Sequence, residues 1–516
     1  MDRAMKNSLK WNLIMNLLLA ASALLFPILL FPYAARVLQP ENIGRVSFAE
    51  SVIAYFLLLS QLGIPTYGVR EISRAREDRQ ESARIAGELF GLNLLMAAIS
   101  FMLLLAGTCF IPRFREDRAL FLITGAGLFL NALGMEWLYR GRELYVPIAV
   151  RSFSVKAVCF VLVFLSVRDT TAVLRFACLY MTAIYGAGIL NFIGARKYLG
   201  TGEPIHKLNI SRHFPAVFVF FAMACATTVY THLDAVMLGF ISGNMELGFY
   251  NAAIKIKVLL VSLVTSIGTV LLPRITMSLK KGDLAVCHRL VDTTRRFVWD
   301  FSVPMTVFFI LFARPTLQLL SGEHFLPAVP AMRWILLTLL PIGMSNLIGI
   351  EILVPLGREK AVLIAELIGA GVDLSMNLIL IPQYGAAGAA VGTVAAELAV
   401  LLFQLWTLHR IALNSWQNSN KSDALARMLG LWEWDNIGRV VITAILSVLL
   451  TGRLFENLLL KSEEISIVSL TVGLFGAFLL FAALYLLGLL LLREKLLMQC
   501  LEWMKTGGKE GANGKK

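Results

Sequence analysis

Long apolar stretches recur along almost the whole chain, and they constrain its fold more than any motif does. Of the 516 residues, 58% are hydrophobic and 16% are charged, so a soluble fold would lack polar surface. A helix needs about 20 apolar residues to cross the roughly 30 Å core of a bilayer, and we therefore expect an all-α polytopic membrane protein with about fourteen transmembrane helices. Their expected ranges are 11–35, 46–66, 85–110, 119–139, 147–167, 172–194, 214–240, 248–272, 297–320, 328–355, 361–382, 386–408, 438–456 and 465–492.

A helical hairpin within residues 31–56 has a second copy about 200 residues later, which indicates an internal repeat. In both copies a leucine precedes a polar turn that ends in glycine, an alanine follows, and the second helix ends at a proline before basic residues. The shared order indicates two lobes of like topology with the working site between them. The matched positions are Leu38, Asn42 to Gly44, Ala49, Pro65 and Arg70 in the first copy, and Leu238, Glu246 to Gly248, Ala253, Pro273 and Arg274 in the second.

The repeat divides the chain into three parts. We expect an N-terminal six-helix lobe over residues 1–200 and a C-terminal six-helix lobe over 201–412. Residues 413–516 follow as a polar linker, a terminal helix pair at about 438–492 and a basic tail. Within the second lobe, residues 277–296 mix both charge signs with apolar residues at near-helical spacing, which is typical of either an amphipathic surface helix or a solvated connector.

Lysine and arginine are distributed unevenly between alternate loops, and this bias predicts the orientation. With both termini in the cytoplasm, the cytoplasmic loops and tails hold roughly 32 basic residues and the outer loops roughly 10. The net charge of +13 therefore reflects membrane orientation, and we expect no nucleic-acid partner. Arg113, Arg115 and Arg118 run against this pattern, because they fall in an outer loop.

Sequence motifs of enzymes and metal sites are absent. The six cysteines show no C-x-x-C or metal-ligand spacing, so we expect structural thiols, no metal and no cofactor. The chain has no G-x-S-x-G, H-E-x-x-H or Walker A motif. Its expected outer loops are all short, which disfavours a membrane-embedded polysaccharide polymerase or acyltransferase. We therefore expect a transporter rather than an enzyme.

Eight short strings in collinear order carry a family resemblance. The chain resembles bacterial polysaccharide-biosynthesis flippases of the multidrug/oligosaccharidyl-lipid/polysaccharide exporter superfamily, from its N-terminus to residue 410. The strings are FPYAARVLQPENIGRVSFAESVIAYF from residue 31, LGIPTYGVREI from 62, EWLYRG from 136, LDAVMLG from 233, GFYNAAIKI from 248, GTVLLPR from 268, PLGREK from 355 and NLILIPQYGAAGAA from 377.

The resemblance implies two six-helix lobes that form a V around a central cavity, two extra C-terminal helices and alternating access. It implies a polyprenyl-diphosphate-linked oligosaccharide as substrate, moved from the cytoplasmic to the outer leaflet of a bacterial inner membrane for O-antigen, capsule or exopolysaccharide assembly. Membrane lipids, polysaccharide polymerase machinery and H+ or Na+ as coupling ion are the expected partners. The alternatives are a multidrug or metabolite cation antiporter of the same superfamily and a lipid-linked peptidoglycan precursor flippase.

Charges inside the membrane are the candidate site residues, because a charge near the bilayer centre is costly unless it is paired or hydrated. Asp234 on the seventh expected helix and Lys255 and Lys257 on the eighth lie at similar depths. The two lysines point roughly 200 degrees apart, so we expect one to pair with Asp234 and the other to bind the diphosphate. We favour Lys257 for the diphosphate. The alternative is a purely structural network.

The first lobe offers further candidates, namely Lys156 and Arg151 on the fifth expected helix, and Arg36, Arg45 and Glu50 on the repeated hairpin. Lys156 is too deep for its side chain to reach the interface, so we rank it above Arg151. Arg36 and Arg45 lie near the outer surface, where an interfacial role competes with a ligand role. Lys156 and Lys257 together would supply cations from both lobes to the diphosphate.

Acidic residues enter the later expected helices. Glu366, Asp373 and Asn377 share one helical face, because they are seven and four residues apart. With Glu397 they form a polar stripe that fits uptake of a coupling H+ or Na+, and interhelical hydrogen bonds are the alternative. Asp234 and Glu50 belong to the same ion-coupling or structural group.

Overall fold

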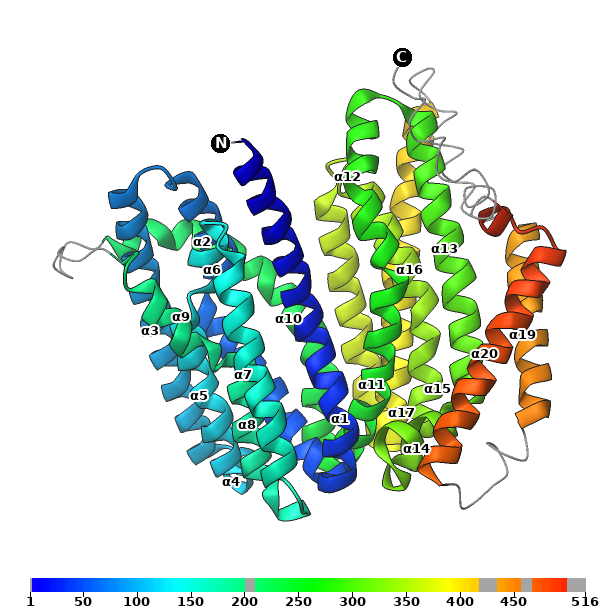
Figure 1. The fold of residues 1–516 in the computed structure, drawn as a ribbon, viewed down its shortest axis with the longest axis horizontal. Coiled ribbons are helices and arrows are strands. Elements are labelled where there is room, and N and C mark those ends of the chain that lie inside the picture. The colour runs from blue at the N-terminus through cyan, green and yellow to red at the C-terminus, as the bar shows by residue number, and fades with distance from the viewer. Residues whose placement is uncertain (1, 200–208, 417–433, 456–465, 499–516) are drawn as a thin grey trace. The chain divides into compact units, whose positions relative to one another are not determined.

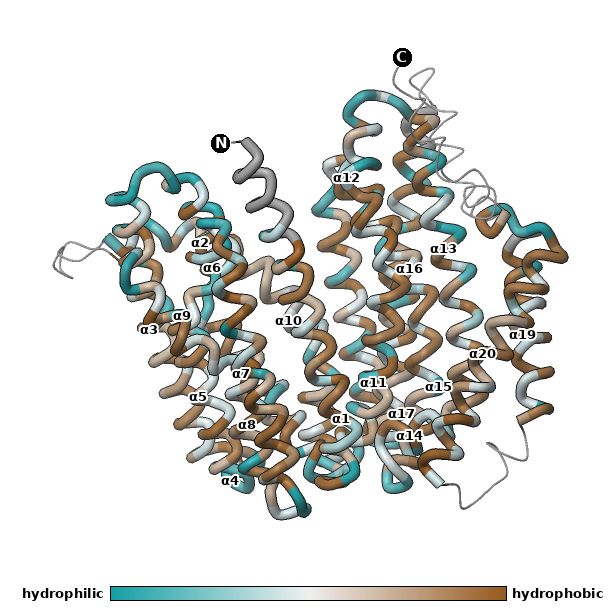
Figure 2. Tube along the Cα trace, viewed as in Figure 1, coloured by the Kyte–Doolittle hydropathy of each residue, from teal (hydrophilic) through white to brown (hydrophobic). Residues whose placement is uncertain are grey.

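The computed structural model describes residues 2–199, 209–416, 434–455 and 466–498. Within these ranges every regular element is a helix, and ten helices are long and apolar enough to cross a membrane, or twelve when each of two bent pairs counts as one span. Hydrophobic residues run along the helices, and hydrophilic residues gather at many of the turns (Figure 2). The expectation of an all-α polytopic membrane protein is confirmed, and the number fourteen stays a prediction.

Two very long helical segments each hold two of the expected spans. α1 (Asp2–Gln61) is interrupted at Gln39, whose φ of 65° is left-handed, directly before Pro40. Proline cannot donate to the helix ladder, so the first helix ends here and the second begins. α17 (Glu359–Trp416) is interrupted in the same way at Gly385, where φ is 51°. The expected ranges 361–382 and 386–408 lie on either side of this break.

The chain divides into two compact units, residues 1–251 and 252–516. The expected lobe boundary after residue 200 stays a prediction, and the first unit includes the helix expected to open the second lobe. The helices of the first unit are α1, α2 (Ile64–Arg74), α3 (Arg79–Phe110), α4 (Pro112–Glu116), α5 (Arg118–Gly134), α6 (Glu136–Gly141), α7 (Tyr145–Ser166), α8 (Val173–Tyr185), α9 (Ala187–Ala195), α10 (Phe214–Ile241) and the start of α11 (Asn244–Val264).

Within the first unit, α1 packs against α3, α7 and α10 (Figure 1). Its core joins α2, α3, α6 and α7 through side chains with no exposed surface, among them Leu89, Leu138 and Ile148. Asp78 caps α3 by accepting from the backbone N–H groups of Gln80 and Glu81 at 2.9 and 3.0 Å. The cap fixes where α3 turns back from α2.

The turns of the two repeated hairpins touch inside this unit. A Cβ on Gly44 would lie 1.7 Å from the carbonyl oxygen of Asn244, and one on Gly248 would lie 2.1 Å from the carbonyl oxygen of Pro40. A side chain at either position would collide with backbone, so glycine permits this close approach. The glycine that the two copies share therefore has a packing role in both.

The second unit continues α11 and ends in a helix pair. α19 and α20 pack side by side and against α13, with Phe308 and Phe481 each 1% exposed between them. The expected terminal pair at 438–492 corresponds to α19 and α20, whereas most of the expected linker and basic tail lie outside the described residues. The helices are α12 (Ser266–Lys281), α13 (Leu284–Leu311), α14 (Ala313–Ser321), α15 (Val329–Ile335), α16 (Leu339–Asn346), α17, α19 (Trp434–Phe455) and α20 (Ile467–Leu491).

Residues 277–296 form the end of one helix and the start of the next. α12 ends at Lys281, Gly282 turns the chain with a φ of 74°, and α13 begins at Leu284. Arg295 and Arg296 are 2% and 4% exposed, so the last part of this stretch lies in the core of the unit. The stretch is therefore a helical hairpin that is exposed at its turn, Lys280 to Asp283, and buried at its end, and its position on a membrane surface stays a prediction.

Candidate functional site

Lys156 lies buried on α7, with 9% of its surface exposed. Its Nζ donates to Oγ of Ser22 on α1 at 3.0 Å, and this hydroxyl donates in turn to the carbonyl oxygen of Leu19 at 2.8 Å. No carboxylate of the described residues lies within ion-pair distance of Lys156. A lysine ammonium has three N–H donors, so a single hydroxyl leaves it with capacity for an anion.

Arg151 lies on the same helix but is held by other helices. One of its guanidinium nitrogens donates to the Tyr139 hydroxyl at 3.0 Å and to Oδ1 of Asn191 at 3.1 Å. The guanidinium also lies 5.4 Å from the centre of the Tyr139 ring. Arg151 therefore joins α7 to α6 and α9, which gives it a packing role.

Arg36 and Arg45 on α1 are half-buried and have close partners. Arg45 pairs with Asp117 through two nitrogens, one of them Nε at 2.9 Å, and also contacts Oδ1 of Asn42 at 3.1 Å. Arg36 donates to the carbonyl oxygen of Pro32, one turn earlier, at 2.9 Å. These contacts anchor the repeated hairpin and the start of α5.

The structure gives a reason for one of the outer-loop arginines. Arg113 on α4 donates to the carbonyl oxygen of Gly239 at 3.2 Å and to Oδ1 of Asn244 at 2.7 Å. Its guanidinium also lies 5.5 Å from the centre of the Phe48 ring. The side chain thus joins α4 to the turn between α10 and α11, which gives it a packing role.

Two acidic candidates of the first unit accept hydrogen bonds from tyrosines. Glu50 on α1 is half-buried and bonds the hydroxyl of Tyr180 on α8. Asp234 on α10 is 8% exposed and accepts from the hydroxyl of Tyr250 on α11. Each carboxylate therefore connects two helices.

The two lysines of α11, Lys255 and Lys257, are half-buried and lie in the second unit. Lys257 contacts no carboxylate of the described residues. The expected pairing of one lysine with Asp234 stays a prediction.

The acidic stripe of the second unit lies across the break in α17. A Cβ on Gly392 would lie 2.4 Å from Oδ1 of Asn377 and 3.4 Å from Oδ1 of Asp373. The structure thus brings Asp373 and Asn377 together on the face toward the second half of α17. Asp373 and Asn377 are buried, and Glu366 lies within electrostatic reach of Glu397.

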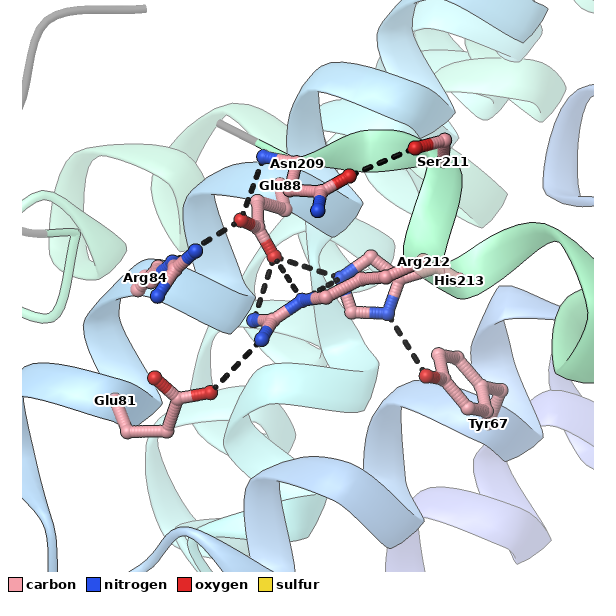
Figure 3. Close-up of polar contacts among 8 residues, drawn as sticks. All are labelled: Tyr67, Glu81, Arg84, Glu88, Asn209, Ser211, Arg212 and His213. Atoms are coloured by element: carbon pink, nitrogen blue, oxygen red, sulfur yellow. Dashed lines mark hydrogen bonds and ion pairs between the residues drawn. The ribbon is translucent and has the colours of Figure 1, made fainter. Parts of the chain in front are cut away.

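A buried glutamate that sequence reasoning did not single out forms the densest charge cluster of the first unit (Figure 3). Glu88 on α3 has no exposed surface. Its Oε1 accepts from the backbone N–H of Asn209 at 2.9 Å and from Arg84 at 3.3 Å. Its Oε2 accepts from two nitrogens of Arg212 at 2.8 and 2.7 Å and lies 2.8 Å from Nε2 of His213. The carboxylate is therefore fully surrounded by donors.

The same cluster fixes the chain just before α10. Nδ1 of His213 lies 2.8 Å from the Tyr67 hydroxyl on α2, and Arg212 also contacts Glu81 at 3.2 Å (Figure 3). Because Glu88 and Arg212 are 124 residues apart, no local spacing in the sequence signals the pair. The sequence does offer one weak signal, because Glu88 is the single acidic residue in the expected apolar helix 85–110.

A second buried glutamate lies in the second unit in a different setting. Glu351 is 1% exposed and belongs to the π-helical segment Leu347–Leu353, a geometry found often at functional sites. It shares a hydrogen bond with the Thr294 hydroxyl, and its Oε2 has no partner in the described part of the chain. A Cβ on Gly268 would lie 1.9 Å from its Oε1, so a glycine makes room for this carboxyl group.

The buried arginines of α13 form a third charge cluster. Nε of Arg295 and Nε of Arg296 donate to the two oxygens of Asp292 at 3.1 and 2.8 Å. Arg296 also lies 3.6 Å from Oε1 of Glu494, which follows α20. The cluster ties the chain just after α20 to α13.

Two family models match the chain. The model described as "Polysaccharide biosynthesis protein" matches residues 9–279, and that described as "Lipid II flippase MurJ" matches residues 209–453.

Two curated relatives and one solved structure are similar to the chain over most of their length. The chain is 24% identical over 405 residues to a "Putative O-antigen transporter" of Shigella dysenteriae, covering 77% of this chain and 99% of the relative. It is also 24% identical over 409 residues to a protein of the same name from Escherichia coli strain K12, covering 78% and 96%. The inward closed structure of the lipid II flippase MurJ superposes with a TM-score of 0.71 at 13% identity, covering 93% of this chain and all of that one. The structural likeness supports a common fold.

Proposed function

The chain belongs to the family of polysaccharide biosynthesis proteins, and from this membership we propose that it is a flippase for a polyprenyl-diphosphate-linked oligosaccharide. It moves the lipid-linked sugar from the cytoplasmic to the outer leaflet of a bacterial inner membrane by alternating access, with both termini in the cytoplasm. The named O-antigen transporters among its relatives support surface polysaccharide assembly as the process it serves.

Lys156 is the observation that carries the proposal. It is a buried cation on a membrane-spanning helix whose hydrogen-bond partner is a neutral hydroxyl. Such a charge is costly in the membrane unless it meets an anion or water. A diphosphate is an anion that must cross the same region. Lys156 and Lys257 are therefore the proposed diphosphate contacts, with Lys255, Arg151, Arg36 and Arg45 as weaker candidates because most of these have other partners.

The coupling ion is proposed to be H+ or Na+, taken up by carboxylates of the second unit. Asp373 and Asn377 offer oxygens on one face of α17, and Glu366 and Glu397 lie close enough to interact. Oxygen ligands suit hard cations, and paired carboxyls suit a shared proton. Glu50 and Asp234 are the corresponding acids of the first unit.

A lipid-linked peptidoglycan precursor is the second candidate substrate, because the lipid II flippase model matches residues 209–453. Both candidates carry a polyprenyl diphosphate and differ in the sugar. The proposed lysine contacts would bind the diphosphate of either lipid. The two candidates are therefore distinguished by which sugar the protein transports.

Reconstitution tests the proposal. The purified chain in liposomes is supplied with a labelled polyprenyl-diphosphate oligosaccharide or with labelled lipid II, and the label that reaches the opposite leaflet is measured. We expect the oligosaccharide to move, and its rate to fall roughly tenfold or more in Lys156→Met and in Lys257→Met. Lys281→Met, an exposed lysine at the end of α12, is the matched control and should transport at the native rate. Native rates in both site variants would contradict the assignment of Lys156 and Lys257 as diphosphate contacts. Failure of the native chain to move either lipid would contradict the flippase function.

A further inference from the structure

A polar cavity of about 650 Å³ opens inside the first unit, and its wall contains Asn191, the hydrogen-bond partner of Arg151, and Glu136, which lies within electrostatic reach of Lys156. Its wall comes from α1, α2, α3, α5, α6, α7, α8 and α9, so it lies within one compact unit. Ligand pockets typically measure roughly 300–1,000 Å³, so this cavity has the size of a small-molecule site.

The wall carries many hydrogen-bonding groups and almost no net charge. Its amides are Asn16, Gln61, Asn93, Asn131 and Asn191. The charged groups in the wall are Glu136 and Arg140, which pair with each other at 3.0 Å. Their side chains are 47% and 43% exposed, which places the pair at the mouth of the cavity. An anion would find no unpaired cation in this wall.

Several of these groups keep hydrogen-bonding capacity for a ligand. Nε2 of Gln61 donates to Oδ1 of Asn131 at 2.9 Å, which leaves the oxygen of Gln61 and the nitrogen of Asn131 available. Trp137 lines the cavity and is 5% exposed, and its indole N–H has no acceptor in the described part of the chain. Buried donors without an acceptor are rare in proteins, so this N–H calls for a hydroxyl or a water.

The position of Trp137 is built into the fold. A Cβ on Gly68 of α2 would lie 2.7 Å from Cε3 and 2.9 Å from Cδ2 of the indole. A glycine is therefore needed for the ring to pack against α2. Tyr145 and Tyr185 add two more aromatic rings to the wall.

From this wall we propose that the cavity binds the neutral sugar portion of the lipid-linked substrate. Amide and hydroxyl groups match the donors and acceptors of a polyhydroxylated ring, and aromatic faces match its apolar C–H faces. The balanced charge of the wall disfavours the diphosphate, which would stay with the lysines. This inference rests on the proposed flippase function and assigns its sugar specificity to the first unit.

The orientation of the chain adds a role for the cavity. The half-exposed pair Glu136 and Arg140 lies on α6, whose last residue Gly141 accepts a hydrogen bond from Ser73 near the end of α2, where the basic residues predict the cytoplasmic side. A sugar site at this end would select the substrate when it loads. Selection would follow from hydrogen bonds, because a site built to bond hydroxyls rejects a ligand that lacks them.

Liposome transport with two substrates tests the inference. One is a polyprenyl diphosphate with the full oligosaccharide, and the other is the same lipid with a single sugar. For the native chain we expect faster transport of the oligosaccharide. In Trp137→Phe and in Gln61→Leu, the oligosaccharide rate should fall roughly tenfold while the single-sugar rate stays near native, so the preference is lost. Trp334→Phe, an exposed tryptophan on α15, is the matched control.

The outcomes separate this inference from the function it rests on. A native chain that moves neither lipid would overturn the flippase. Variants that keep the native preference, or that lose both rates in proportion, would overturn the sugar site while leaving the flippase intact. Thermal unfolding of each detergent-solubilised variant identifies misfolding, and Trp137→Phe is the conservative change that keeps the packing against Gly68.

Discussion

Glu88 in the first unit and Glu351 in the second are equally buried, and their surroundings differ completely. Glu88 accepts from a backbone N–H, two arginines and a histidine. Glu351 has the single hydroxyl of Thr294 and an oxygen without a partner among the described residues. The first setting stabilises a carboxylate, because opposite charges surround it. The second suits a neutral acid, because an unpaired buried charge is costly.

Burial alone therefore does not identify a functional charge in this protein. Both oxygens of Glu88 already accept hydrogen bonds, so this carboxylate holds the chain before α10 against α2 and α3. Glu351 lies in a π-helical segment and keeps hydrogen-bonding capacity, which is more typical of a binding site than of a structural ion pair. Removing the charge from each glutamate separates the two roles.

The largest effect is expected for Glu88→Gln. The change keeps the volume but leaves Arg212 and His213 without their carboxylate, and breaking a buried pair typically costs about 3–5 kcal/mol. Denaturant unfolding of the detergent-solubilised protein should show a loss of that size. Glu81→Gln is the control, because Glu81 bonds the same Arg212 but its side chain is 37% exposed. The control should lose less than about 1 kcal/mol. Equal losses of unfolding free energy in Glu88→Gln and Glu81→Gln would show that burial gives Glu88 no special weight in the cluster.

His213→Phe should have the next largest effect, about 2 kcal/mol in unfolding free energy. Phenylalanine fills similar space and removes the bonds to Glu88 and to the Tyr67 hydroxyl, and hydrogen bonds to charged groups are worth about 1.5–3 kcal/mol. Tyr67→Phe removes only the second bond and should cost about half as much. If the two variants lost the same amount, the contact of His213 with Glu88 would contribute nothing.

Sequence reasoning predicted the helical class and the terminal helix pair, because apolar length and turn residues are local signals. It also placed Asp373 and Asn377 on one face, since helical spacing is local as well. It missed Glu88, whose partners Arg212 and His213 lie more than 120 residues away. It also took Arg295 and Arg296 as part of a surface stretch, although both are buried at the end of a hairpin that is exposed at its turn. Charge patterns show that residues are polar, and only tertiary packing shows which of them are enclosed.

A smaller effect is expected for Thr294→Val. Thr294 is 1% exposed, and its hydroxyl lies within hydrogen-bond reach of both Glu351 and the Leu290 carbonyl oxygen of its own helix, the latter at 3.2 Å. Valine keeps the shape and removes the bond, so the unfolding free energy should fall by about 1 kcal/mol. Thr293→Val is the neighbouring control, because both hydroxyls donate to a carbonyl oxygen one turn earlier and Thr294 alone of the two also contacts Glu351. A loss near 4 kcal/mol in Thr294→Val would mean that Glu351 depends on this bond as a charged group does.

The smallest effect is expected for Glu351→Gln. The carboxamide oxygen can still accept from Thr294, and the NH2 group takes the place of an oxygen that has no partner among the described residues. An amide at this position would therefore make the same contacts as a neutral carboxylic acid. We expect a change of about 0.5 kcal/mol or less in unfolding free energy, below the typical value of one hydrogen bond. Glu351→Ala separates charge from packing, because it also leaves a cavity and should cost more. If Glu351→Gln cost as much as Glu88→Gln, both glutamates would be paired charges, and the contrast between the two units would be lost.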